Sequence, residues 1–326
     1  MRLLNRRAFL KDITQIGGAI CLGNVKPRLC YSNPISRKVN VSLVRSPKVW
    51  NGNRLDPSII RKMLDQGIQS ISGCDLVSKA WNSFFSSRDI VAMKVNCIGK
   101  ETGSTKPELS YAVAECLHKY VNIPLENIII FDRSDKELAL AGYRINKSQK
   151  GIKIYETPSY SPRIKSGRIS IDISTIITEK CTALINLPLL KTHRGAKLTL
   201  ALKNHYGSIA PEIVQTNKFH SEGFENVVHV NSNSLIKEKT RLCIADGLIA
   251  QFDQGPRGDP RYQWRYSGLI MGTDPVAVDT LGLEVINEKR KAENLSPFRV
   301  RYLKWAAREG LGEHDNISIE LMKETI

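Results

Sequence analysis

Short apolar runs that end in a polar residue recur along this chain, and signals for helix starts separate them. Alternation of buried strands with helices is typical of an α/β fold built on a parallel sheet. The sequence therefore predicts an α/β fold whose mainly parallel sheet is flanked by helices in Rossmann-like layers. The expected strands cover residues 39–44, 89–97, 127–131, 183–187, 242–245, 269–271 and 317–321.

Three helix starts are marked by residues that can satisfy the free N–H groups of a first turn. Asp56 is expected to cap a helix that ends near Gly67. Thr105 and Glu108 have the spacing of a capping box, which predicts a second helix start. Asp274, which a proline follows, is expected to cap an apolar helix.

The length of 326 residues allows two lobes of ordinary size. A basic stretch near 148–180, rich in serine and proline, is a soft boundary between them. We therefore expect a signal segment at 1–34 and two α/β lobes at 35–160 and 161–326.

The N-terminus resembles a twin-arginine export signal. Arg6 and Arg7 precede Phe-Leu-Lys, and a short, weakly apolar stretch follows at 13–22. The resemblance implies that the twin-arginine export machinery carries the folded protein to the periplasm or the cell exterior. An uncleaved signal would leave it tethered to the membrane. No apolar run reaches the roughly 18 residues of a stable membrane-spanning helix.

Basic residues outnumber acidic ones and give the chain a formal net charge of +16. A basic surface attracts anionic partners, although general solubility also explains such an excess. Aromatic residues make up only 7%, and no basic run reaches five residues, which argues against nucleic acid. The charge therefore favours a small anionic molecule, with an anionic polymer as the alternative.

The seven cysteines include no C-x-x-C pair and no zinc-type spacing with histidine. An iron–sulfur cluster needs closely spaced thiolates, so the pattern argues against one. We expect these thiols to be packing residues. The cofactor is unknown, and a metal held by other side chains stays open.

Polar residues gather where the expected strands end, at Lys94, Asn96, Asp132, Asn186 and Asp246. Ligands of open α/β sheets bind beyond the carboxyl ends of the parallel strands. We therefore expect a ligand site at this edge of the sheet, although polar strand ends also occur where no ligand binds.

The densest polar cluster follows the expected strand at 183–187. We predict that Lys191, His193 and Lys203 are catalytic residues. A lysine can clamp an anion, form a Schiff base or act as a base when desolvated. A histidine can transfer protons or bind a metal. A solvated basic loop is the alternative explanation.

Further residues are predicted to bind the ligand. Gly103, Ser104 and Thr105 precede a helix start, where free N–H groups attract anions. Gly255 lies in a Gly-Pro-Arg-Gly turn that lets the backbone approach a ligand closely. Ordinary turns explain both segments equally well. The full predicted ligand-binding set is Lys94, Asn96, Gly103, Ser104, Thr105, Asn186, Asn204 and Gly255.

Two aspartates are predicted to orient the cations or to hold a metal. Asp246 ends an expected strand, and Asp279 lies one turn into the apolar helix that follows Asp274. An unpaired acid at the Asp279 position would be costly if it were buried.

Eight short motifs occur in a fixed order along the chain. They are Met-Lys-Val-Asn at 93–96, Gly-Ser-Thr-Lys-Pro-Glu at 103–108, Phe-Asp at 131–132, Ile-Asn-Leu-Pro-Leu-Leu-Lys-Thr-His at 185–193, Leu-Lys-Asn-His-Tyr-Gly at 202–207, Ile-Ala-Asp-Gly at 244–247, Gly-Pro-Arg-Gly at 255–258 and Thr-Asp-Pro-Val-Ala-Val-Asp at 273–279. In this order they resemble the domain of unknown function 362 family over about residues 90–285. The resemblance implies no defined biochemical role. Some members carry ferredoxin-type cysteine motifs, which this chain lacks.

Three functions are consistent with these features. The favoured one is an exported protein that binds or transforms a small anionic ligand or cofactor in a cleft of lysine, histidine and aspartate. The alternatives are a non-catalytic module that binds polyanions and an accessory or assembly factor for an envelope redox protein. Whether the protein is an enzyme stays open at this point.

Overall fold

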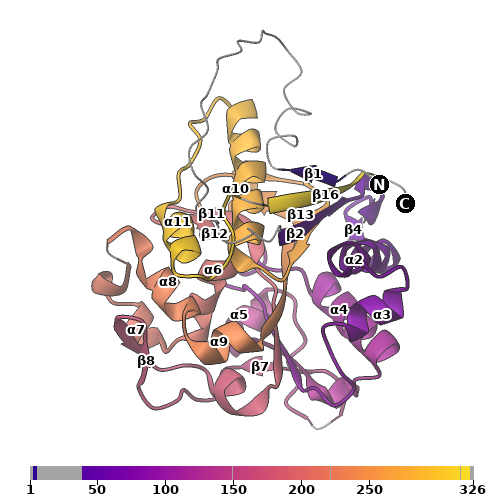
Figure 1. Ribbon diagram of the computed structural model, residues 1–326, viewed down its shortest axis with the longest axis horizontal. Coiled ribbons are helices and arrows are strands. Elements are labelled where there is room, and N and C mark those ends of the chain that lie inside the picture. The colour runs from indigo at the N-terminus through magenta and orange to yellow at the C-terminus, as the bar shows by residue number, and fades with distance from the viewer. Residues whose placement is uncertain (1–2, 6–38, 149, 221, 316, 324–326) are drawn as a thin grey trace, which may run out of the picture.

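The computed structural model describes residues 3–5, 39–148, 150–220, 222–315 and 317–323. Its main feature is a twelve-stranded sheet with the strand order β1-β16-β2-β15-β13-β10-β5-β6-β7, from which β11, β12 and β14 branch at β13 (Figure 1). The strands of this sheet are β1 (Leu3–Asn5), β2 (Val39–Arg45), β5 (Val91–Lys94), β6 (Ile128–Asp132), β7 (Lys153–Glu156), β10 (Ala183–Asn186), β11 (Leu189–His193), β12 (Lys197–Thr199), β13 (Thr240–Gln251), β14 (Gln263–Trp264), β15 (Gly268–Gly272) and β16 (Ile317–Lys323). The predicted α/β class is therefore confirmed.

Parallel pairing dominates the part of the sheet that holds the predicted site. Strands β13, β10, β5, β6 and β7 are parallel neighbours in that order. Antiparallel pairing joins β15 to β13 and to β2. Strands from both predicted lobes share this one sheet, while the division at 35–160 and 161–326 stays a prediction.

Helices cover both faces of the sheet (Figure 1). The helices α2, α3 and α4 pack with one core cluster, and α6, α8, α9, α10 and α11 pack with the other. Their bounds are α2 (Pro57–Ser72), α3 (Val77–Asn82), α4 (Pro107–Val121), α5 (Asp135–Leu140), α6 (Ala201–Asn204), α7 (Pro211–Val214), α8 (Asn226–Asn231), α9 (Ser234–Lys239), α10 (Pro275–Ala292) and α11 (Arg301–Arg308). Small two-stranded sheets pair β3 (Trp50–Asn51) with β4 (Arg54–Leu55) and β8 (Ile164–Ser166) with β9 (Ile169–Ile171).

Two helix starts form as the sequence predicts. Asp56 accepts the N–H of Ser58 at 2.8 Å, and Asp274 accepts the N–H of Ala277 at 2.9 Å. The predicted end of α2 is wrong. The helix continues through Gly67, where a Cβ atom would meet the Met271 sulfur, and stops at a left-handed glycine after Ser72. Gly67 therefore serves close packing of α2 on the sheet.

The predicted capping box at the start of α4 is also wrong. The Thr105 hydroxyl accepts the N–H of Asn96 at 3.0 Å and donates to the Leu187 carbonyl at 2.8 Å. It thus connects the ends of β5 and β10. The first free N–H of the helix, from Lys106, is instead bound by Asp246 at 2.7 Å. A residue from a strand 140 positions later replaces the local cap.

The strand predicted at 242–245 is longer than expected. β13 runs on to Gln251, pairing first with β10 and then with β11 after a shift in register. The motif Asp-Gly at 246–247 therefore lies inside the strand.

None of the helices among the described residues combines the length and hydrophobicity needed to cross a bilayer. The twin-arginine motif, Arg6 and Arg7, lies outside the described residues.

Candidate functional site

A cavity of about 230 Å³ lies at the carboxyl ends of β5 and β6, beside α6 and the short helix η4 (His205–Ser208). Five of the predicted site residues line it: Lys94, Asn96, His193, Lys203 and Asn204. A second cavity of about 560 Å³ adjoins it and shares the lining residues Ile98, Arg133 and Pro256. The loop at 99–102 and the Gly-Pro-Arg-Gly turn at 255–258 line the second cavity.

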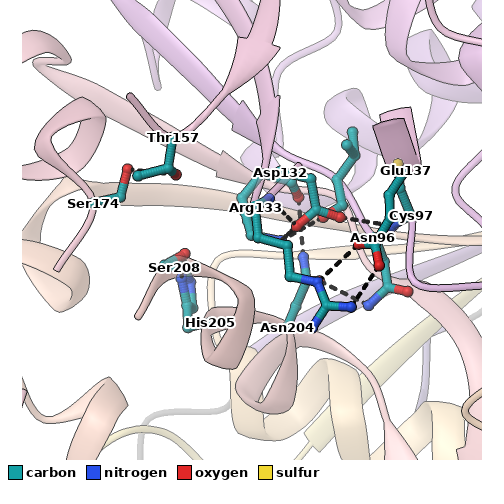
Figure 2. A network of polar contacts seen from close by, with 12 residues as sticks. Asn96, Cys97, Asp132, Arg133, Glu137, Thr157, Ser174, Asn204, His205 and Ser208 are labelled. Carbon is teal, nitrogen blue, oxygen red and sulfur yellow. Dashed lines mark hydrogen bonds and ion pairs between the residues drawn. The ribbon is translucent and has the colours of Figure 1, made fainter. Parts of the chain in front are cut away.

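Lys94 is a buried lysine with a complete set of partners. Its ammonium donates to Asp132 at 2.8 Å and to the Val95 carbonyl at 2.6 Å. Asp132 also accepts the backbone N–H groups of Cys97 and Arg133 at 2.7 and 2.9 Å (Figure 2). Buried charges are tolerated when they are paired and hydrogen-bonded in this way. The Lys94–Asp132 pair therefore holds the ends of β5 and β6 together.

Three asparagines form a continuous chain of amide hydrogen bonds beneath the cavity. Asn96 donates to Asn204 at 3.1 Å, and Asn204 donates to Asn186 at 2.8 Å. Asn204 also donates to the Lys94 carbonyl at 3.0 Å. Each amide thus has its orientation fixed by its neighbour, and the chain joins the ends of β5 and β10 to α6.

His205 extends this chain on the side away from Asn96. The Nδ2 group of Asn186 donates to His205 Nε2 at 3.2 Å, so the proton of the neutral ring lies on Nδ1, 3.3 Å from the Ser208 hydroxyl. Burial and the charge of Lys94 lower the pKa of His205 to about 3. His205 is therefore a neutral structural link.

Lys191, a predicted catalytic residue, does not line the cavity itself but contacts the lining residue Asn96. Its ammonium donates at 2.8 Å both to Asn96 Oδ1 and to the Gly103 carbonyl. The side chain is completely buried and forms no ion pair with any described carboxylate. Burial lowers its pKa to about 7. Lys191 therefore positions Asn96 and carries a charge that no described carboxylate balances.

Lys203 differs from the other two lysines because its ammonium makes no hydrogen bond and no ion pair with any residue that the structure describes. It lies 3.9 Å from the ring centre of Tyr206 and 5.3 Å from that of Phe224. Only 6% of the residue is exposed. Burial, with the nearby charge of Lys191, lowers the pKa of Lys203 to about 7. A desolvated amine that lacks a polar partner thus borders the cavity.

His193 borders the same cavity from the end of β11. Its Nδ1 atom accepts the backbone N–H groups of Gly195 and Ala196, both at 3.1 Å. The proton of the neutral ring therefore lies on Nε2. Burial and the charge of Lys203 lower the pKa of His193 to about 3. His193 is thus a hydrogen-bond donor at neutral pH, and its part in proton transfer stays a prediction.

Comparison with known proteins adds the family. A family model described as a domain of unknown function (DUF362) matches residues 91–284, which is more than half of the chain. The chain belongs to the DUF362 family. The predicted extent of about 90–285 is thereby confirmed, and the DUF362 match includes every residue that lines the cavity. No curated protein matches the sequence.

One solved structure, a protein from Thermotoga maritima, aligns at a TM-score of 0.42 and 11% identity. The alignment covers 73% of this chain and 60% of that one. The DUF362 chain thus spans less than two thirds of the length of that protein.

The two predicted metal ligands of the DUF362 chain lie apart from the cavity lining. Asp246 accepts the N–H groups of Lys106 and Leu248, and Asp279 accepts those of Ala201 and Leu202. Both oxygens of each carboxylate are used in this way. Asp279 thereby caps α6, which explains a buried acid inside an apolar helix. No cluster of three metal-ligating side chains exists within the described ranges.

The predicted ligand-binding glycines are explained by close backbone contacts. A Cβ atom on Gly103 would lie 2.6 Å from the Cα of Gly258, and one on Gly255 would lie 1.8 Å from the Thr192 carbonyl. The loop at 99–103 and the turn at 255–258 therefore pack against each other. Ser104 is buried, and its hydroxyl has no partner among the described residues.

Several lining residues lie outside the predicted set, among them Thr199 and His220. The hydroxyl of Thr199, at the end of β12, is buried and lacks a hydrogen-bond partner within the described part of the chain. His220 lines the same cavity and contacts Tyr206 and Phe224 edge to face. Thr199 lies within an apolar run, and His220 ends the short helix η5 (Asn217–His220) away from the motifs of the sequence, so neither carries a sequence signal.

Proposed function

We propose that this cavity binds a small anionic molecule. The observation that carries the proposal is the buried amine of Lys203, which borders the cavity without a polar partner. An isolated buried ammonium is costly, and an anion next to it would offset that cost. The adjacent Lys191 adds a second charge that no described carboxylate balances.

The neutral groups around Lys203 support the same ligand class. His193 offers an N–H donor, and Thr199 offers a hydroxyl that has no other partner among the described residues. Donors around a cation are the arrangement that carboxylates and phosphates require. A volume of about 230 Å³ corresponds to roughly eight water molecules, which limits the ligand to a small molecule or to one end of a larger one.

The adjoining cavity extends the space available to such a ligand. Arg133 borders both cavities and holds Glu137 through its Nε and Nη2 groups at 2.8 and 2.5 Å. Lys100 and Arg257 border the outer cavity together with Glu101 and with Glu137, the partner of Arg133. Three basic side chains thus face two acidic ones there, which leaves a small positive excess on the route toward Lys203.

Calorimetric titration with sulfate, inorganic phosphate and acetate tests the proposal. We expect the wild type to bind at least one of these anions and Lys203→Met to lose at least about tenfold in affinity. Lys62→Met, which removes an exposed lysine of α2, should bind as the wild type does. Absence of binding to all three anions, or equal binding by Lys203→Met, would overturn the proposal.

The competing proposal is a surface that binds polyanions. The dependence of binding affinity on salt concentration distinguishes such a surface from a cavity site. Surface binding of a polymer weakens steeply with salt and involves many exposed cations. A cavity ligand should instead depend on Lys203 and not on exposed cations such as Lys62, and an oligonucleotide should not displace it.

Export in the folded state also remains a proposal, based on Arg6 and Arg7. Replacing both by lysine should retain a reporter fused after residue 34 inside the cell. Export of the doubly substituted fusion at the wild-type level would contradict this part of the account.

A further inference from the structure

We infer that the anion also carries an aldehyde or ketone group and that Lys203 forms a Schiff base with it in this cavity. The inference rests on the proposed anion site and names the chemical class of its ligand. The protonation state of the lysine decides what it can do. A protonated lysine can only attract an anion, whereas a neutral lysine has a free electron pair that can attack a carbonyl carbon.

The surroundings of Lys203 favour the neutral amine. The charge that acts on Lys203 is that of another cation, Lys191. The charged groups that line the cavity with Lys203 are already paired, Lys94 with Asp132 and Arg133 with Glu137. The histidines His193 and His220 are neutral because burial lowers the pKa of each. With its own pKa at about 7, a large share of Lys203 is deprotonated at neutral pH.

The electron pair of this amine is also free. No described residue donates a hydrogen bond to Lys203 Nζ, and its contacts are the faces of Tyr206 and Phe224. A lysine that serves only structure uses its nitrogen, as Lys94 does with Asp132 and the Val95 carbonyl. Lys203 instead presents an unused nitrogen to a cavity of about 230 Å³.

Groups that would assist the carbonyl oxygen lie at the same cavity. His193 carries its proton on Nε2, and the Thr199 hydroxyl lacks another partner among the described residues. Neutral donors of this kind stabilise the oxygen as negative charge develops on it. The aromatic faces of Tyr206 and Phe224 would then stabilise the positive charge of the product.

The step balances with the ligand, the protein and solvent alone. The Lys203 nitrogen forms a bond to the carbonyl carbon, and the C=O electron pair moves to oxygen, which gives a carbinolamine after proton transfer. The C–O bond then breaks, the oxygen leaves as water, and one proton taken from solvent balances the iminium charge. No oxidant or reductant takes part.

Reductive trapping tests the inference. The full chain is incubated with pyruvate or glyoxylate at neutral pH in the presence of cyanoborohydride, and peptide mapping locates the reduced adduct. We expect the adduct on Lys203 at least tenfold faster than on the exposed Lys62 or Lys100. Lys203→Met should lose the fast adduct and keep the slow labelling of the exposed lysines.

Sulfate titration of the same wild-type sample separates this inference from the proposed function. Sulfate binding without faster trapping at Lys203 would overturn the Schiff base and leave the anion site intact. Absence of both would overturn the two proposals together. Fast trapping that sulfate competes away would support both.

Discussion

Lys94 and Lys203 border the same cavity and are almost equally buried, yet their surroundings differ completely. Lys94 is bound to Asp132 and to a backbone carbonyl, whereas Lys203 contacts only aromatic faces among the described residues. A lysine with complete partners stabilises the fold, and removal of one partner leaves a buried charge. A lysine without partners contributes little to the fold, and its retention at a cavity requires another explanation. We propose that ligand binding is that explanation.

The largest expected effect is a loss of stability when the Lys94–Asp132 pair is broken. Asp132→Asn keeps the shape of the side chain but removes the charge that balances Lys94. We expect a loss of about 3–5 kcal/mol in the free energy of unfolding, measured with urea, because a buried ammonium remains unpaired.

The matched control for Asp132 is Glu115, which pairs with Arg61 at an exposed position. Glu115→Gln should change the free energy of unfolding by less than about 1 kcal/mol. If the two variants lost equal stability, the Lys94–Asp132 pair would not be the structural element that we describe.

The second prediction compares the two lysines directly through methionine substitutions. Lys94→Met leaves the Asp132 carboxylate buried without its counter-charge, so we expect a loss of about 3 kcal/mol. Lys203→Met leaves no partner behind and removes an amine whose pKa is lowered by burial, so its free energy of unfolding at neutral pH should equal or exceed that of the wild type. Equal losses in the two variants, measured by urea unfolding, would remove the distinction on which the account depends.

The third prediction concerns pH. Burial lowers the pKa values of Lys191 and Lys203 to about 7 in the folded protein, below the ordinary lysine value of 10.5. Between these values the unfolded chain binds more protons than the folded one, so stability rises with pH. Each lysine contributes up to about 1.4 kcal/mol per pH unit in this window.

Urea unfolding at several pH values between about 8 and 9.5 measures this slope. Lys203→Met should reduce the slope of the unfolding free energy against pH by the contribution of one lysine. Lys62→Met should leave that slope unchanged. An identical slope in the wild type and Lys203→Met would show that the Lys203 pKa is not lowered.

The smallest expected effect concerns Thr199, whose hydroxyl is buried without a described partner. Thr199→Val preserves the shape and removes the donor. We expect sulfate affinity to fall by about two- to fivefold, or roughly 0.5–1 kcal/mol, and stability to stay equal or rise. Unchanged affinity in the calorimetric titration would place Thr199 outside the ligand site.

The fold was largely predictable because buried parallel strands and locally capped helices leave local signals. The runs at 39–44 and 127–131 became β2 and β6, and Asp56 and Asp274 cap their helices as expected. The errors arose where a distant residue replaced a local one. Asp246 binds the start of α4 from β13, which no local spacing reveals.

The candidate site was predictable in its location and less so in the roles of its residues. Polar strand ends correctly placed Lys94 and Asn96 at one cavity with Lys203. The sequence could not show which lysine has a carboxylate partner, because Asp132 reaches Lys94 from a neighbouring strand. It also could not show that His193 accepts backbone hydrogen bonds on Nδ1, which fixes its role as a donor.

The protons that the protein takes up when an anion binds report directly on whether Lys203 holds that anion. At about pH 8 the free Lys203 amine is mostly neutral, and a bound anion would favour its protonated form. Calorimetric titration with sulfate in buffers of different ionisation enthalpy should therefore show that the wild type takes up close to one proton more than Lys203→Met does. Sulfate binding without proton uptake by the wild type would contradict the account.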